Sequence, residues 1–163
     1  LGIFAMQESA NVVPGRENEI KVEVVNRSQG NDRIGLRIQG IPAHWIVAQS
    51  GFVTIPAGET VELSAVIKPP LDPAIPTGRQ RALLHLVSQQ HPDADVSTTM
   101  NLVVTPFFTF NASLDPRQLR LPGTVTVSVQ NTGTSSGTFS VIPRDSQDAL
   151  EFSGETGDRK SVV

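Results

Sequence analysis

The side chains best suited to metal binding or proton transfer in this chain are three histidines, His44, His85 and His91. None of them stands at the spacing of a metal-binding motif from another ligand-type residue, and the chain has no cysteine to complete a zinc site. His85 lies between Leu84 and Leu86, so the alternation of a β-strand would turn its ring toward solvent. We therefore predict no metal site at the histidines.

Acidic side chains form several close pairs, as a calcium loop or an acid/base pair would require. Asp93 and Asp95 could hold calcium in a loop, and so could Asp145 and Asp148. A calcium loop, however, gathers more oxygen ligands and a turn glycine, which neither segment offers. Glutamate pairs on strand faces or turns are interpreted as solubilising charges: Glu17 with Glu19, and Glu59 with Glu62. We predict solvated acids in all four places.

The sequence offers no convincing motif for nucleophilic catalysis or phosphate binding. The Gly-x-Ser-x-Gly spacing occurs at residues 133–137, but no helical pattern follows it and no histidine stands in a suggestive arrangement with a serine, so a nucleophile elbow is not expected. The Gly-Glu-Thr segments at residues 58–60 and 154–156 are turn sequences without a phosphate-binding loop behind them. The sequence thus predicts no catalytic residue, no cofactor and no enzyme. The alternative is an enzyme with an unrecognised site, which would need a deep cleft lined by histidines or acids with shifted pKa values.

Trp45 is the one tryptophan of the chain and allows two interpretations. In a sandwich, a lone tryptophan beside a strand usually fills the core, and this is the role that we expect. The alternative is an exposed platform on which a sugar ring stacks. The chain has no tyrosine to extend such a platform.

Composition and charge exclude further classes of protein. The 163 residues carry 13 lysines and arginines against 16 aspartates and glutamates, a net charge of −3 with both signs mixed along the chain. This distribution contains no basic stripe, so nucleic-acid binding is not expected. No hydrophobic run reaches membrane-spanning length, so direct membrane insertion is not expected either. The hydrophobic fraction of 38% is sufficient for a folded core.

The elements that would position any site are β-strands joined by turns. Apolar and polar residues alternate with period 2 in residues 20–24 and again in 34–38, the pattern of half-buried strands. Proline, glycine and asparagine mark turns between such segments, and no segment of useful length has a helical period. About seven short strands are expected in the first module, at residues 3–6, 20–24, 34–38, 52–55, 61–67, 80–87 and 97–104. The predicted fold class is all-β, an immunoglobulin-like antiparallel β-sandwich.

An internal repeat indicates tandem modules. Pro14-Gly15 followed by residues 20–28 recurs as Pro122-Gly123 followed by residues 125–133. Another alternating strand is expected after each copy, at residues 34–38 in the first and 138–142 in the second. We predict an Ig-like β-sandwich over residues 1–105 and the N-terminal part of a second one over residues 106–163.

The second module has room for roughly half the strands of a sandwich. A half sandwich exposes an apolar face and unpaired edges, and Phe107, Phe108 and Phe110 are the expected packing residues at its start. We expect it either to borrow strands from a second copy of the chain, forming a homodimer, or to be poorly ordered.

Four motifs in order carry a family resemblance. They are a proline-glycine turn (Pro14-Gly15), a strand ending in Asn26-Arg27-Ser28, a segment from Ile41-Pro42 to Trp45, and a hairpin at Pro56-Ala57-Gly58-Glu59. In these motifs the first module resembles the bacterial and archaeal Ig-like repeats called NEW3 or alpha-galactosidase-associated domains, which are related to CARDB-type cell-adhesion modules. The resemblance implies architecture rather than catalysis, and a location outside the cytoplasm or at the cell surface.

Taken together, the sequence predicts a non-catalytic Ig-like module of a larger bacterial protein. It would act as a spacer or as a protein-binding scaffold, and its partners would be another protein or other domains of the same polypeptide. The alternative function is a carbohydrate-binding accessory module of a glycoside hydrolase, which requires Trp45 and at least one phenylalanine exposed on a common face.

Overall fold

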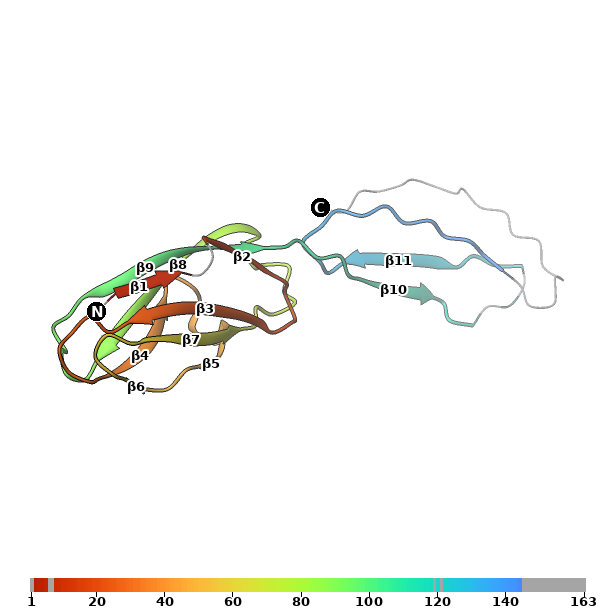
Figure 1. The fold of residues 1–163 in the computed structure, drawn as a ribbon. Coiled ribbons are helices and arrows are strands. Elements are labelled where there is room, and N and C mark those ends of the chain that lie inside the picture. Colours follow the sequence, from red (N-terminus) through yellow and green to blue (C-terminus); the bar gives the residue numbers. More distant parts are fainter. Residues whose placement is uncertain (1, 6–7, 119, 121, 145–163) are drawn as a thin grey trace. The chain divides into compact units, whose positions relative to one another are not determined.

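The structure is a computed structural model that describes residues 2–5, 8–118, 120 and 122–144. It divides into two compact units, Leu1–Pro106 and Phe107–Val163, which we call unit 1 and unit 2 and describe separately. Within the described residues, the elements are β-strands and one 3₁₀ turn, Ala43–Trp45, and no helix is long and apolar enough to cross a membrane. The fold class is all-β, as predicted (Figure 1).

Unit 1 is an Ig-like sandwich of two sheets (Figure 1). The four-stranded sheet has the order β1 (Gly2–Ala5), β3 (Asn18–Val25), β7 (Thr60–Ile67), β5 (Ile46–Gln49). The five-stranded sheet has the order β2 (Ser9–Val12), β9 (Val96–Val104), β8 (Gly78–Ser88), β4 (Asp32–Gln39), β6 (Val53–Ile55).

Alternation along the strands builds the core. In β3, Ile20, Val22 and Val24 are buried, whereas the charged residues between them are not. Each such aliphatic side chain contributes about 1.5–3 kcal/mol when it leaves water, so the two inner faces hold the sheets together. The core consists of Val12, Ile20, Val22, Val24, Ile34, Leu36, Ile38, Trp45, Ile55, Leu63, Ala65, Ile67, Ala82, Leu84, Leu86, Met100, Leu102 and Val104.

The N-terminal segment of unit 1 pairs with both sheets. β1 runs antiparallel to β3, and β2 then runs parallel to β9 from the pair Ser9 and Asn101 to the pair Val12 and Val104. The other strand pairs that the structure describes in unit 1 are antiparallel. The sequence predicts neither β2 nor β5, because β2 buries one side chain, that of Val12, and β5 buries none. Backbone pairing places these two strands, and the apolar pattern therefore gives no sign of them.

The described part of unit 2 contains one antiparallel pair, β10 (Phe110–Asp115) with β11 (Thr126–Asn131). The strand predicted at residues 138–142 is wrong, since no strand forms there and Val141 and Ile142 are exposed. A strand requires a neighbouring ladder and a face to bury, and no described residue of unit 2 is buried. The interpretation of residues 106–163 as part of a second sandwich, with its boundary at 105, stays a prediction.

Candidate interaction surfaces

Trp45 lies in the core of unit 1, with 1% of its surface exposed. It ends the 3₁₀ turn, and its N–H donates to the Pro42 carbonyl at 3.0 Å. Its own carbonyl accepts a hydrogen bond of 2.7 Å from the N–H of Lys68, which fastens the turn to the end of β7. The prediction that Trp45 fills the core is therefore confirmed. The alternative role as an exposed platform for a sugar ring is wrong.

The three histidines lie on separate elements of unit 1. His44 is exposed in the 3₁₀ turn, His91 is exposed in the loop after β8, and His85 lies in β8 with its ring turned away from the core. The His85 side chain is 27% exposed, and its Nε2 lies 3.2 Å from Oδ1 of Asp95, a side chain that is 87% exposed. In the part of the chain that the structure describes, no three His, Cys, Asp or Glu residues gather as metal ligands.

The predicted acid pairs are exposed wherever the structure describes them. Asp93 and Asp95 are exposed in the loop before β9, and their carboxylates are the solvated acids that the sequence suggests. Glu59 follows a tight turn, and Glu62 lies on the outer face of β7. Asp145 and Asp148 lie outside the described residues, and so does the segment 154–156.

A buried carboxylate that sequence reasoning missed holds β4 to β8. Asp32 is 1% exposed, and both of its carboxylate oxygens lie within 2.8 Å of the hydroxyl oxygen of Ser88. The same hydroxyl oxygen accepts a hydrogen bond of 2.8 Å from the backbone N–H of His91. Because the Ser88 hydroxyl keeps its proton and donates it in a hydrogen bond to the carboxylate, this pair is a structural tie rather than an activated nucleophile. In the sequence, the available signal was an aspartate at the first position of a strand whose inward residues are apolar.

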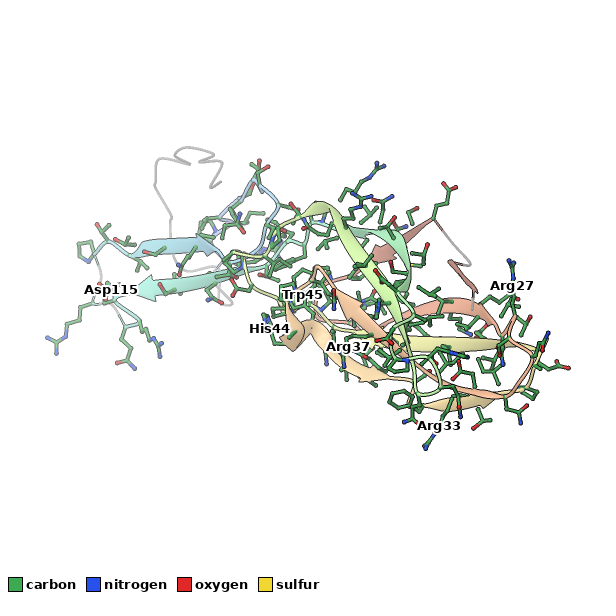
Figure 2. The ribbon with its side chains drawn as sticks, turned by 90° about the vertical axis from the view of Figure 1, so that its left-hand side faces the viewer. Arg27, Arg33, Arg37, His44, Trp45 and Asp115 are labelled. Atoms are coloured by element: carbon green, nitrogen blue, oxygen red, sulfur yellow. The ribbon has the colours of Figure 1, made fainter. Side chains whose placement is uncertain are left out.

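The outer face of the five-stranded sheet carries four exposed arginines, Arg33 and Arg37 on β4 and Arg79 and Arg81 on β8, which we call the arginine face. Each arginine takes an outward position of its strand, on the opposite side from the core residues, and Arg37 stands directly opposite His85. Within the described residues, no carboxylate lies within salt-bridge distance of any of the four. Figure 2 shows Arg33 extending away from the strands.

Phe52 covers the middle of the arginine face. Gly35 is the outward position of β4 between Arg33 and Arg37, and a Cβ placed there would meet the Phe52 ring at 3.3 Å. The guanidinium carbon of Arg33 lies 6.0 Å from the centre of the same ring, within the range of a cation–π contact. The ring therefore packs on the glycine on one side and interacts with a guanidinium. Leu83 and Val87, half-buried outward residues of β8, form an apolar strip with Phe52.

The outer face of the four-stranded sheet has the opposite charge. It carries Glu19, Lys21 and Glu23 of β3 and Glu62 of β7, and we call it the glutamate face. The Lys21 Nζ lies 2.7 Å from Glu62 and 3.9 Å from Glu19. The hydrogen bond to Glu62, with the charges of Glu19 and Glu62, raises the pKa of Lys21 above its ordinary value. Three carboxylates against one ammonium leave this face acidic.

Neither charged face is evident from the net charge of the chain. Arg33 and Arg37 come more than forty residues before Arg79 and Arg81, and only the pairing of β4 with β8 brings them together. The usable signal was the outward position of each arginine in an alternating strand, read across two strands at once.

A buried asparagine closes the turn after β3. Asn26 is fully buried, and its side-chain oxygen accepts hydrogen bonds from the N–H of Ser28 at 3.0 Å and from the Ser28 hydroxyl at 2.7 Å. Its side-chain nitrogen donates to the carbonyls of Gly30 and Ile55, both at 2.8 Å. The side chain therefore fixes a local turn and also fastens that turn to β6.

Asn131 repeats the local part of this arrangement in unit 2. Its side-chain oxygen accepts from the N–H of Gly133 at 3.0 Å, and its side-chain nitrogen donates to the Ser135 carbonyl at 2.8 Å. These are the same i+2 and i+4 positions as in the Asn26 turn. Asn26 follows β3, which pairs antiparallel with β1, and Asn131 is the last residue of β11, which pairs antiparallel with β10.

Three phenylalanine rings pack together in unit 2. Phe110 and Phe139 meet edge to face with ring centres 5.0 Å apart, and Phe108 lies 5.9 Å from Phe110 and 5.7 Å from Phe139. Such aromatic contacts are favourable, but Phe108 and Phe110 stay nearly half exposed. Other large apolar side chains of this unit are exposed as well: Leu114, Val125, Val127, Val141 and Ile142.

Comparisons with known proteins yield no family. No protein-family model matches the chain, and no curated protein sequence matches it. Among solved structures, the chain is similar to a PapD-like domain of human CEP192, with 13% identity, a TM-score of 0.39, and coverage of 63% of this chain and 83% of that one. It is also similar to WR4, an MSP family member of C. elegans, with 10% identity, a TM-score of 0.41, and coverage of 63% and 97%.

A further likeness is to the E. coli chaperone DraB, with 12% identity and a TM-score of 0.44. It covers 63% of this chain and 54% of DraB, so the chain matches about half of that protein. The fold assignment of unit 1 rests on its own two sheets and their registers. Membership of the NEW3 or CARDB-like repeats stays a prediction from the sequence motifs.

Proposed function

We propose that this chain is a non-catalytic Ig-like module of a larger bacterial protein, located outside the cytoplasm or at the cell surface, and that it binds a protein partner. The location and the source follow from the resemblance of its motifs to NEW3 and CARDB-like repeats. A spacer role needs no binding surface at all, whereas the arginine face supplies one.

The observation that supports protein binding is the arginine face itself. Its four guanidinium groups have no carboxylate partner among the described residues, although the chain has more acids than bases. Arginine and aromatic residues are enriched at protein interfaces, and Phe52 with Leu83 and Val87 adds an apolar strip beside the charges. A neutral spacer would gain nothing from concentrating one charge on one sheet.

The alternative function, a carbohydrate-binding accessory module, loses its principal feature. It requires Trp45 and a phenylalanine exposed together, but Trp45 is buried in the core. The exposed ring of Phe52 packs on Gly35 and has Arg33 6.0 Å from its centre, so it is one partly covered ring without the tryptophan that this function requires beside it.

Photo-crosslinking in the producing organism tests the proposal. A benzophenone amino acid is placed at Thr99, an exposed outward position of β9 beside the arginine face, or at Thr60, an exposed outward position of β7 on the other sheet. We expect a polypeptide adduct from the Thr99 position and less from the matched Thr60 position. Absence of a polypeptide adduct from both positions would refute protein binding and leave only the spacer role.

The homodimer predicted through residues 106–163 is a separate proposal. The exposed apolar side chains of unit 2, such as Phe108 and Phe110, support it. Light scattering behind a sizing column tests it directly, since a dimer gives twice the mass of the 17.5 kDa chain. A monomeric mass at every concentration used would reject the homodimer and would leave the proposal of protein binding at the arginine face unaffected.

A further inference from the structure

We propose that the arginine face of unit 1 binds an extended acidic segment of a partner polypeptide, about ten residues long. This inference deepens the proposed function and depends on it, because it names the chemistry of the partner and the surface of contact.

The length follows from the registers of β4 and β8. Arg79 and Arg81 are two residues apart on β8, Arg37 stands opposite His85, and Arg33 of β4 stands opposite Gln89, whose N–H donates to its carbonyl. The four arginines thus mark positions 79, 81, 85 and 89 of a single axis. At about 3.3 Å per residue, this axis is about 33 Å long, the length of ten residues of extended chain.

The charge pattern favours carboxylates. A guanidinium group is planar and presents a fork of N–H donors that matches the two oxygens of a carboxylate, so arginine suits carboxylate recognition better than lysine does. All four bases of this face are arginines, although the chain also uses lysine, as at Lys21 and Lys68. Asp95, in the loop before β9, has its Oδ1 3.2 Å from Nε2 of His85, an outward residue of this face.

The same geometry disfavours a nucleic acid. Binding of single strands relies on aromatic rings whose faces are free to stack on bases. Phe52 is the ring on this face, and it packs on Gly35 while Arg33 interacts with it. The remaining outward residues of β8 and β9 are His85, whose Nε2 lies 3.2 Å from Oδ1 of Asp95, and aliphatic or uncharged polar side chains such as Leu83 and Thr99. These side chains suit the backbone and side chains of a peptide.

A second copy of the chain is a less suitable occupant. Its glutamate face is acidic, but Lys21 occupies the centre of that face and is bonded to Glu62. A contact between the arginine face of one copy and the glutamate face of the next would also be heterologous, so it would propagate as an open chain of copies.

The test measures binding of a labelled peptide to the full chain by fluorescence anisotropy. The probe is a twelve-residue peptide of alternating Glu and Ser, and the control probe has Gln in place of Glu. We expect saturable binding of the Glu-Ser peptide at about 25 mM salt, weakened at least about tenfold at about 300 mM salt, and none of the Gln-Ser peptide. No binding of the Glu-Ser peptide up to about 1 mM overturns the proposal.

Matched variants locate the surface. R37E with R81E should weaken binding at least about tenfold, since two guanidinium groups of the face become carboxylates. The control R16E with K68E makes the same change in net charge at two exposed positions away from this face and should alter affinity less than about twofold. Equal losses in both pairs would show attraction to net charge alone and would overturn the proposal. If the charge reversal impairs folding, as judged by Trp45 fluorescence, R37Q with R81Q serves in its place.

Three further arms decide between occupants. Replacement of all four arginines by lysine keeps the charge and should still weaken binding severalfold, because the forked geometry is lost. Tighter binding of a twelve-nucleotide oligothymidylate than of the Glu-Ser peptide overturns the proposal in favour of a nucleic acid. Self-association that R37E with R81E abolishes overturns it in favour of a second copy.

The photo-crosslinking experiment distinguishes failure of this inference from failure of the proposed function. Adducts from the Thr60 position alone would support protein binding and contradict binding at the arginine face.

Discussion

Replacement of Asn26 by alanine tests whether one buried amide holds the turn after β3 and the β6 strand together. The substitution removes two hydrogen bonds from the side-chain nitrogen, to the carbonyls of Gly30 and Ile55, and two to the side-chain oxygen from Ser28. Gly30 and Ser28 can find water, whereas the bond to Ile55 is buried.

The expected cost follows from that difference in burial. Leaving the Ile55 carbonyl without its donor costs about 1–3 kcal/mol, and loss of the more exposed bonds adds about 1 kcal/mol. The sum is about 2–4 kcal/mol. With a urea dependence of about 1.5 kcal/mol per molar, the midpoint of unfolding should fall by about 1.3–2.7 M. Asn26→Asp keeps the shape and removes the donor, so it should be at least as destabilising.

The assay is urea unfolding followed by tryptophan fluorescence. Trp45 is the one tryptophan of the chain and lies in the core of unit 1, so its signal reports on that unit. Asn131→Ala is the matched control, because its local hydrogen bonds to Gly133 and Ser135 lie within unit 2. It should leave the Trp45 midpoint within about 0.2 M. A midpoint shift below about 0.3 M for both Asn26 variants would refute the reasoning.

Three further predictions concern unit 1. Trp45→Ala should cost about 3–5 kcal/mol in thermal unfolding followed by circular dichroism, because it empties the largest buried site, and a loss below about 1 kcal/mol would contradict that role. Gly40→Ala should cost about 2 kcal/mol or more, since φ is +84° and the new Cβ would lie 2.7 Å from the Arg81 carbonyl, whereas Gly30→Ala, in open space, should cost less than about 1 kcal/mol; equal effects would refute this. Lys21 has a raised pKa, so its stabilising contribution is present below about pH 10.5 and is lost as pH rises through its folded-state pKa. The chain has no tyrosine or cysteine, so lysines dominate side-chain titration in that range. Lys21→Gln should therefore reduce the change of the urea midpoint with pH between about pH 9.5 and 11.5, and an unchanged pH dependence would argue against the ion pair.

The parts of the fold that the sequence predicts are those in which local pattern and burial agree. β3, β4, β7, β8 and β9 each alternate between buried apolar residues and more exposed, mostly polar ones, and the sequence places each strand within a few residues. Trp45 belongs to the same class, because a large apolar side chain beside a strand has few other places to go.

The arginine face could not be predicted in the same way. Each arginine is an ordinary outward residue within its own strand, and its meaning depends on which strand lies next to it. Net charge averages the arginine face against the glutamate face and conceals both. The prediction that the charges are mixed, with no basic stripe, takes them in chain order, whereas the fold separates arginines and glutamates onto two sheets.

The predicted repeat separates local from non-local causes of structure. Val22 of β3 corresponds in the repeat to Val127 of β11, and Ile20 of β3 corresponds to Val125, the residue before β11 begins. The corresponding side chains differ sharply in burial. In unit 1, Ile20 and Val22 are at most 2% exposed, whereas their counterparts in unit 2, Val125 and Val127, are 40% and 37% exposed. The hydrogen-bonded turns at Asn26 and Asn131, in contrast, share the same two contacts.

An asparagine turn needs only its own five residues, so it forms in both units whatever surrounds it. Burial of one face of an alternating strand needs an opposing sheet. In unit 1, the five-stranded sheet opposes the four-stranded sheet that contains β3. In the described part of unit 2, β10 and β11 form their ladder with no buried side chain. Sequence periodicity therefore states which face of a strand could be buried, and only the rest of the fold, or a partner, determines whether it is.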